Sequence, residues 1–195
     1  GGTLLVGVMG NRRTLAEVRG LLDRAETAPT PAERLHLLRS ADTLLAGISG
    51  PGVGDTVRRE LSEQLRWGLL RAEALQILEG GDASGAKTLL EARAGHVPSL
   101  AKSEHAELVK RVERETLLRE AQDAERRRDV PSAVSAYRRA LELGDPGGLA
   151  TARLTAIYDA LVSAMNKAYA EALKSLKKRD EDIYFESAKQ IHDLF

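Results

Sequence analysis

Apolar residues recur at intervals of three and four along almost the whole chain, the spacing that places them on one face of an α-helix. No stretch shows the alternation of apolar and polar residues that is typical of a half-buried strand. Breaks rich in Gly and Pro divide the pattern into segments. The sequence therefore predicts an all-α chain of about eight helices, over residues 14–28, 31–46, 55–78, 82–94, 99–127, 131–143, 149–177 and 181–195.

Three helix ends carry residue types that favour starting or stopping a helix. Thr30 can cap the amides of the second helix, and Pro31 suits its first turn. Asp55 is placed to cap the third helix, which Gly80 and Gly81 should end. These signals support the boundaries given by the apolar spacing.

The first 13 residues, GGTLLVGVMGNRR, form an apolar segment that precedes the helical pattern. The segment is too short to cross a bilayer, which takes about 20 apolar residues. One interpretation is a frayed or docked end; the other is the end of a truncated membrane anchor, with Arg12 and Arg13 as its cytoplasmic flank. Residues 14–195 are predicted to form a single helical-repeat domain.

Composition and charge narrow the chemistry. The 29 basic and 29 acidic residues leave no net charge, so the long-range field of a dedicated nucleic-acid binder is not expected. The chain has no cysteine, which excludes disulfides and thiolate zinc sites. The four histidines are scattered without paired ligand spacing. We therefore expect no metal site and no binding of nucleic acid.

A search for catalytic and cofactor motifs also gives nothing. The stretch GPGVGDT at residues 50–56 looks like a phosphate loop, but Asp55 stands where such a loop needs a lysine. No GxSxG nucleophile motif occurs. The expectation is a non-enzymatic protein without catalytic residues or cofactor.

Two helix pairs resemble each other at a shift of 47 residues. The stretch GDASGAKTLLEAR at residues 81–93 aligns with RDVPSAVSAYRRA at residues 128–140. The shift matches residues of similar type, namely Asp82 with Asp129, Ala86 with Ala133, Leu90 with Tyr137, Leu70 with Leu117 and Ala74 with Ala121.

The pattern of small and large residues on these pairs resembles the tetratricopeptide repeat family over about residues 66–146. It is carried best by Leu117, Ala121, Ala133, Tyr137, Ala140 and Pro146. The resemblance implies a right-handed solenoid of stacked helical hairpins, with a partner segment along the concave face formed by the first helices. Carried over by position, that face includes Arg71, Leu75, Leu78, Leu118, Gln122, Glu125 and Arg126.

The same residues have a second interpretation, in which Leu75 and Leu78 belong to the core and Glu125 and Arg126 to a solvated face. The C-terminal part also has two interpretations. It concentrates Tyr158, Tyr169, Tyr184 and Phe185, and it either docks on a partner or a second copy of the chain, or caps the array.

A stack of helical hairpins offers an extended surface rather than a deep pocket, which favours binding another protein or a peptide. We therefore expect a protein–protein interaction scaffold or adaptor in the cytoplasm, or on the cytoplasmic face of a membrane if the first residues are an anchor. The alternative is a structural subunit packed permanently inside a larger, possibly membrane-associated complex.

Overall fold

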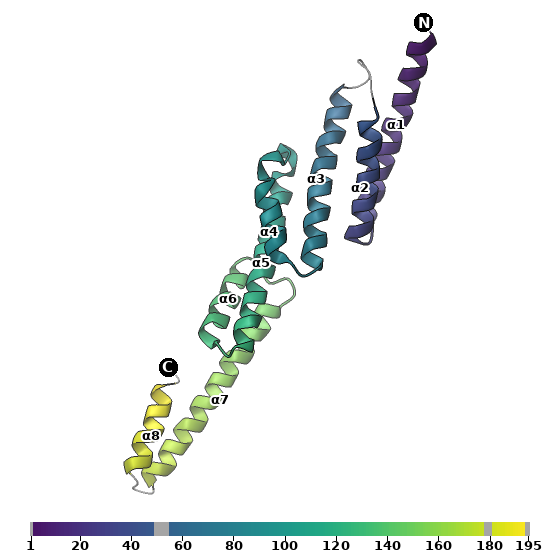
Figure 1. Cartoon of the computed structure of the whole chain (residues 1–195). Coiled ribbons are helices and arrows are strands. Elements are labelled where there is room, and N and C mark those ends of the chain that lie inside the picture. Colours follow the sequence, from purple (N-terminus) through teal and green to yellow (C-terminus); the bar gives the residue numbers. More distant parts are fainter. Residues whose placement is uncertain (1, 49–54, 178–180, 194–195) are drawn as a thin grey trace. The chain divides into compact units, whose positions relative to one another are not determined.

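The computed structural model describes residues 2–48, 55–177 and 181–193, and within these ranges all regular secondary structure is helical. The all-α prediction is thus confirmed. The described part contains two short 3-10 turns, Ala94–His96 and Ser99–Ala101, and eight α-helices (Figure 1): α1 (Gly2–Thr27), α2 (Pro31–Ala46), α3 (Asp55–Glu79), α4 (Ala83–Ala92), α5 (Lys102–Arg126), α6 (Val130–Glu142), α7 (Leu149–Lys177) and α8 (Glu181–His192).

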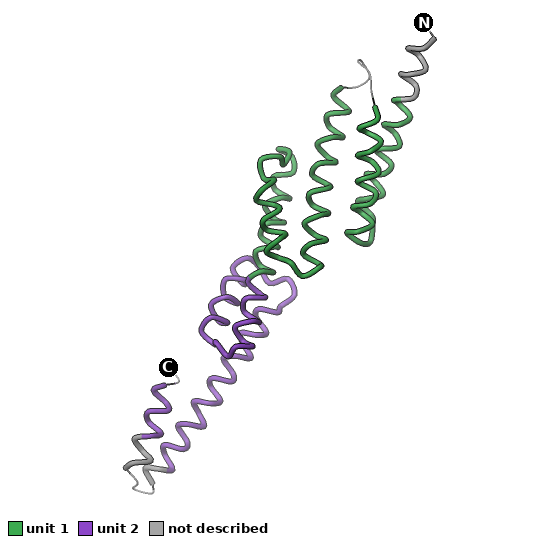
Figure 2. The backbone as a smooth tube through the Cα atoms, in the orientation of Figure 1, with its two compact units in different colours: residues 1–116 green, residues 117–195 purple. Residues whose placement is uncertain are grey.

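The chain divides into two compact units, where a single domain over residues 14–195 was expected. Unit 1 comprises Gly1–Thr116 and unit 2 comprises Leu117–Phe195 (Figure 2). The division falls inside α5.

The first helix differs from its prediction. It begins at Gly2 rather than Thr14, so the apolar segment expected to be separate is continuous with the helix that follows. The segment contains Gly7 and Gly10, but a glycine costs only about 1 kcal/mol inside a helix. Two such costs do not end the helix.

Unit 1 begins with three helices that pack side by side, α2 against both α1 and α3 (Figure 1). Leu35, Leu38 and Ala41 of α2 are buried, as the spacing of three and four requires. α3 lacks a side chain at Gly68, where an added Cβ would lie 3.1 Å from a methyl carbon of Leu38. The small residue therefore allows α2 and α3 to approach closely.

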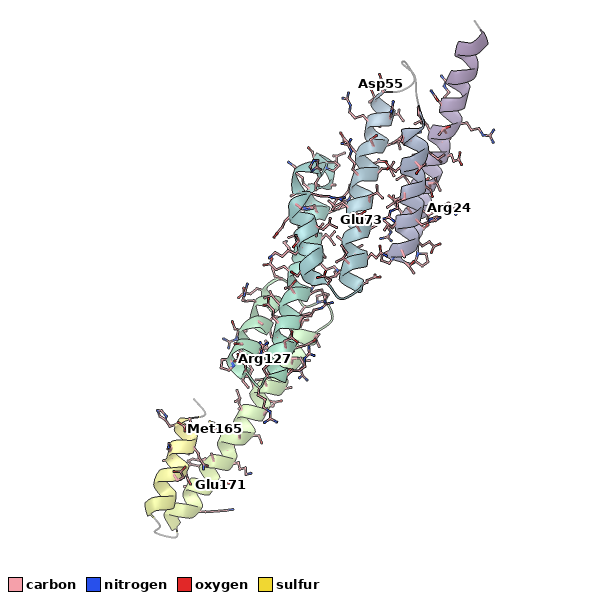
Figure 3. All side chains as sticks on the ribbon, viewed as in Figure 1. Arg24, Asp55, Glu73, Arg127, Met165 and Glu171 are labelled. Atoms are coloured by element: carbon pink, nitrogen blue, oxygen red, sulfur yellow. The ribbon has the colours of Figure 1, made fainter. Side chains whose placement is uncertain are left out.

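A second core in unit 1 lies where α3, α4 and the start of α5 meet. It is built from apolar residues with no more than a tenth of their surface exposed, namely Trp67, Leu70, Ala74, Leu75, Leu78, Ala83, Ala86, Leu90, Ala101, Leu108 and Val112. Glu73 of α3 links this helix to both of its neighbours (Figure 3). Its carboxylate lies 3.9 Å from the guanidinium of Arg39 on α2 and 3.3 Å from that of Arg93, the residue after α4.

Unit 2 is centred on Tyr137 of α6, whose side chain is completely buried. Around it pack residues of α5, α6 and α7: Leu117, Leu118, Ala121, Ala124, Ala133, Ala136, Ala140, Ala150 and Leu154. Beyond this core, α8 packs against the C-terminal part of α7 (Figure 1), where Ala168, Ala172 and Ser187 are buried.

Side chains cap the starts of three helices, and the predicted cap at Thr30 is confirmed. The Thr30 hydroxyl accepts a hydrogen bond from the Glu33 amide at 3.2 Å. Asp82 and Asp129 cap α4 and α6, accepting from the Gly85 amide at 2.7 Å and the Ser132 amide at 3.2 Å. The stretch GPGVGDT, for which a phosphate-binding role was rejected above, lies mostly outside the described residues. Its last two residues, Asp55 and Thr56, form the start of α3.

The turns before Asp82 and before Asp129, which lie 47 residues apart, have the same backbone geometry. The Asp82 amide donates to the carbonyl of Ile77 at 3.1 Å, and the Asp129 amide donates to the carbonyl of Ala124 at 2.9 Å. The residue before each aspartate has a positive φ, 92° at Gly81 and 61° at Arg128. This is the Schellman ending of a helix, in which the residue after the last turn takes the left-handed conformation.

Candidate protein-binding surface

The described part of the chain contains no cluster of three or more His, Asp or Glu side chains that could hold a metal ion. Among the described helices, none is long and apolar enough to cross a bilayer.

In unit 1, the residues predicted to contact a partner separate into core and surface. Leu75 and Leu78 are buried in the second core, because α3 turns that face towards α4 and α5. They belong to the packing of the unit rather than to an open face. Arg71 is exposed, and its guanidinium lies 3.5 Å from the Glu104 carboxylate, which also accepts a hydrogen bond from the Trp67 indole at 3.1 Å.

Unit 2 contains the other four predicted residues, and they separate in the same way. Leu118 is buried in the core around Tyr137. Gln122 and Arg126 are exposed, and Arg126 forms an ion pair with Asp123 one turn before it. Glu125 is only partly exposed and pairs with a residue of α7. The interpretation that Leu75 and Leu78 are core residues is therefore confirmed. Leu118, which was predicted to contact a partner, is a core residue as well.

The pair that Glu125 makes is part of the contact between α5, α6 and α7. Its carboxylate accepts hydrogen bonds from Arg153, and this interaction raises the pKa of the guanidinium further. Burial raises the pKa of Tyr137 beside them, while Arg153 opposes that rise. The Tyr137 hydroxyl is buried without a hydrogen bond of good geometry to any described residue. These groups hold the helices together: the Tyr137 hydroxyl is buried and the Glu125 side chain is mostly covered, whereas the Arg153 side chain is 48% exposed.

The least covered apolar surface lies on α7. Along residues 155–167 of this helix, every side chain is exposed except Ile157 and Met165, which are partly exposed. At one end of this stretch α7 packs against α6, and at the other end against α8. Figure 3 labels Met165 on this part of the helix.

Five large apolar or aromatic residues follow one side of α7, and we call them the α7 stripe: Tyr158, Val162, Met165, Tyr169 and Leu173. Four of them are 40%, 51%, 59% and 40% exposed, at positions 158, 162, 169 and 173. At about 100° per residue, the five side chains span only about 80° of the helix circumference. They therefore form one continuous line.

The α7 stripe is separate from the face that α7 uses inside unit 2. The buried residues Ala150, Leu154, Ala168 and Ala172 are centred about 80° to one side of the middle of the stripe, counted at the same rotation per residue. Packing against α6 and α8 therefore covers the neighbouring face and leaves the stripe open.

Charged side chains lie opposite the stripe and at one end of it, but none lies within it. Lys167 and Glu171 project from the opposite side of α7, as 100° per residue requires. At one end, the guanidinium of Arg138 lies 5.9 Å above the ring of Tyr158 and donates a hydrogen bond to its hydroxyl. A cation over an aromatic face is attractive and holds this ring in place.

The sequence carried part of this signal. The concentration of aromatic residues after position 156 includes Tyr158 and Tyr169 of the stripe, whereas the side chains of Tyr184 and Phe185 lie outside the described residues. What the sequence could not reveal is which side of α7 is covered, because α7 is rich in apolar residues on more than one side.

Comparison of the chain with protein-family models, with curated proteins and with solved structures gives no match. The candidate surface therefore rests on the geometry of this chain alone.

Proposed function

We propose that this chain is a non-enzymatic protein-interaction scaffold that contacts a partner protein through the α7 stripe. The supporting observation is the uncovered line of apolar side chains from Tyr158 to Leu173. Large apolar groups that lie singly on a surface need no explanation, but a continuous line of them is typical of a surface that another macromolecule covers.

The proposal keeps the tetratricopeptide-like architecture as its structural frame. The recurrence of one turn before Asp82 and before Asp129 supports two hairpins of similar construction. Arg71 of unit 1, and Gln122 and Arg126 of unit 2, are exposed and remain candidate contact residues, each within its own unit, in this proposal. The leucines between them contribute packing only.

The alternative is a structural subunit that is packed permanently in a larger complex. The uncovered middle of α7 favours it, because a helix without tertiary contacts is only marginally stable in water. A permanent subunit should aggregate when purified alone, whereas a scaffold with exchangeable partners should remain a monomer or a defined oligomer.

The test is affinity capture of partners from cells that express the tagged chain, quantified by mass spectrometry. Val162→Glu combined with Tyr169→Glu places two charges on the α7 stripe. Ser163→Glu combined with Ala170→Glu is the matched control, because both positions are exposed on another side of the same helix. We expect the parent and the control to retain the same partner and the stripe variant to lose it.

Equal capture by all three proteins would contradict a contact through the α7 stripe. A third variant, Arg71→Glu combined with Arg126→Glu, tests the predicted concave face in the same experiment. Loss of the partner in this variant alone would move the contact to that face. Circular dichroism of each variant should show unchanged helix content.

A further inference from the structure

We propose that the α7 stripe pairs with the same stripe of a second copy of the chain, with the two α7 helices antiparallel. This inference rests on the proposed function, because it names the partner of the same surface.

The spacing of the stripe is symmetric. The first four residues, Tyr158, Val162, Met165 and Tyr169, are separated by four, three and four positions, so the series reads the same in both directions. It is also the heptad spacing that lets one helix follow another along a shared seam. A two-fold axis between residues 163 and 164 would therefore place these four residues of one copy directly on the same four of the other.

The chemistry of the stripe matches this symmetry. In the antiparallel register, Tyr158 faces Tyr169 of the second copy, and Val162 faces Met165 of the second copy. Aromatic rings meet aromatic rings at the two ends, and unbranched and branched aliphatic side chains meet in the centre. Each contact occurs twice, as in any isologous interface between identical chains.

Charge favours the antiparallel orientation over the parallel one. Arg138 lies against Tyr158, at the N-terminal end of the stripe. Parallel helices would bring the two Arg138 guanidinium groups to the same end, whereas antiparallel helices keep them at opposite ends. Antiparallel helices also oppose their macrodipoles. The chain as a whole has no net charge, so two copies do not repel each other at long range.

The first test is sedimentation of the purified full chain over a range of concentrations. The parent protein and the Ser163→Glu, Ala170→Glu control should both form a dimer. The Val162→Glu, Tyr169→Glu variant should dissociate at least about tenfold more readily, because each substitution would bury a charge against Met165 or Tyr158 of the second copy. A parent that stays monomeric, or a dimer that the stripe variant leaves unchanged, would overturn the proposal.

The second test determines the orientation by disulfide formation, which the absence of native cysteine makes unambiguous. Tyr158→Cys and Tyr169→Cys are purified as two single variants and oxidised separately and as a mixture. The antiparallel register predicts a crosslinked dimer mainly in the mixture. Crosslinking of each variant with itself, at the same yield as in the mixture, would indicate parallel helices and overturn the register.

These results are distinguishable from those of the capture experiment. A parent that is monomeric by sedimentation, but that loses a different protein partner when the stripe carries glutamates, would refute self-pairing while the proposed function stands. A dimer that is lost in the stripe variant, together with unchanged capture of other proteins, would support self-pairing as the use of this surface.

Discussion

Asp82 and Asp129, 47 residues apart, each end one helix and begin the next in the same way. The amide of each donates to the carbonyl five residues earlier, and the carboxylate of each accepts from the amide three residues later. Because one residue satisfies groups of both helices, the chain can reverse direction within a short turn. The residue before each aspartate must then adopt a positive φ.

This turn predicts opposite effects at Gly81 and Arg128. Arg128 adopts the left-handed conformation at φ 61°, which costs a non-glycine residue roughly 1–2 kcal/mol. Arg128→Gly should therefore stabilise unit 2 by up to about 1 kcal/mol after the entropy of glycine is deducted. Gly81→Ala should destabilise unit 1 by about 1 kcal/mol or more.

Urea denaturation checks both substitutions. Circular dichroism follows the whole chain, and Trp67, the single tryptophan, reports on unit 1 by fluorescence. Arg128→Lys is the control that keeps both the charge and the left-handed cost. Equal stability of Arg128→Gly and Arg128→Lys would show that the backbone conformation at residue 128 carries no cost.

The two alterations of Tyr137 separate packing from hydrogen bonding. Tyr137→Ala should destabilise by about 3–5 kcal/mol, because it leaves a cavity at a fully buried position. Tyr137→Phe should cost less than about 1 kcal/mol or stabilise slightly, because the hydroxyl it removes is buried without a well-formed hydrogen bond. Thermal unfolding measures both. A loss with Phe as large as the loss with Ala would mean that the hydroxyl, through Arg153, carries the contact.

Ala133 lies one turn before Tyr137 and has no exposed surface. Ala133→Leu should destabilise by about 1–3 kcal/mol, because a larger side chain would push apart helices that approach closely there. Val134→Leu on the partly buried side of the same helix is a suitable control for added volume. If both variants unfold at the temperature of the parent, Ala133 does not mark the helix contact.

Asp145 makes the start of α7 sensitive to acid. Hydrogen bonds from the amide and then from the hydroxyl of Thr151 hold the pKa of its carboxyl below the ordinary value of 3.8. Its stabilising contribution is therefore complete above that value and is lost as the pH falls through the lower pKa of the folded state. Asp145→Asn keeps an acceptor but does not titrate.

Thermal unfolding from about pH 5 to about pH 2 should thus show a steeper loss of stability for the parent than for Asp145→Asn. Asp159→Asn, at an exposed carboxylate on the same helix, serves as the reference for removing one negative charge. Parallel curves for the parent and Asp145→Asn would show that this cap does not titrate with folding.

Local signals in the sequence predicted most helix boundaries. The limits of α7 were predicted at Leu149 and Lys177, and Thr30 and Pro31 located the start of α2, because these ends depend on residues a few positions apart. The start of α1 was predicted too late, because the first 13 residues were interpreted as a frayed or docked end, or as the end of a membrane anchor, rather than as part of the helix. Boundaries are predictable where capping residues determine them.

The surface could be predicted only in part. Periodicity identifies which residues of α3 and α5 are apolar, but not whether another helix covers them, and Leu75, Leu78 and Leu118 prove to be buried. On α7, by contrast, apolar residues prove to be exposed. Ala168 and Ala172 face α8, which leaves Tyr169 uncovered, and this choice between neighbouring faces depends on tertiary contacts.

Photo-crosslinking in the living cell, from a benzophenone amino acid placed at position 169, tests most directly whether the α7 stripe is a protein-binding surface. The same amino acid at position 163, exposed on another side of α7, is the control. If the α7 stripe contacts a protein, whether a second copy or another chain, position 169 should give a discrete covalent adduct and position 163 should give none. No adduct from position 169, or the same adducts from both positions, would contradict the claim that the α7 stripe is a protein-binding surface.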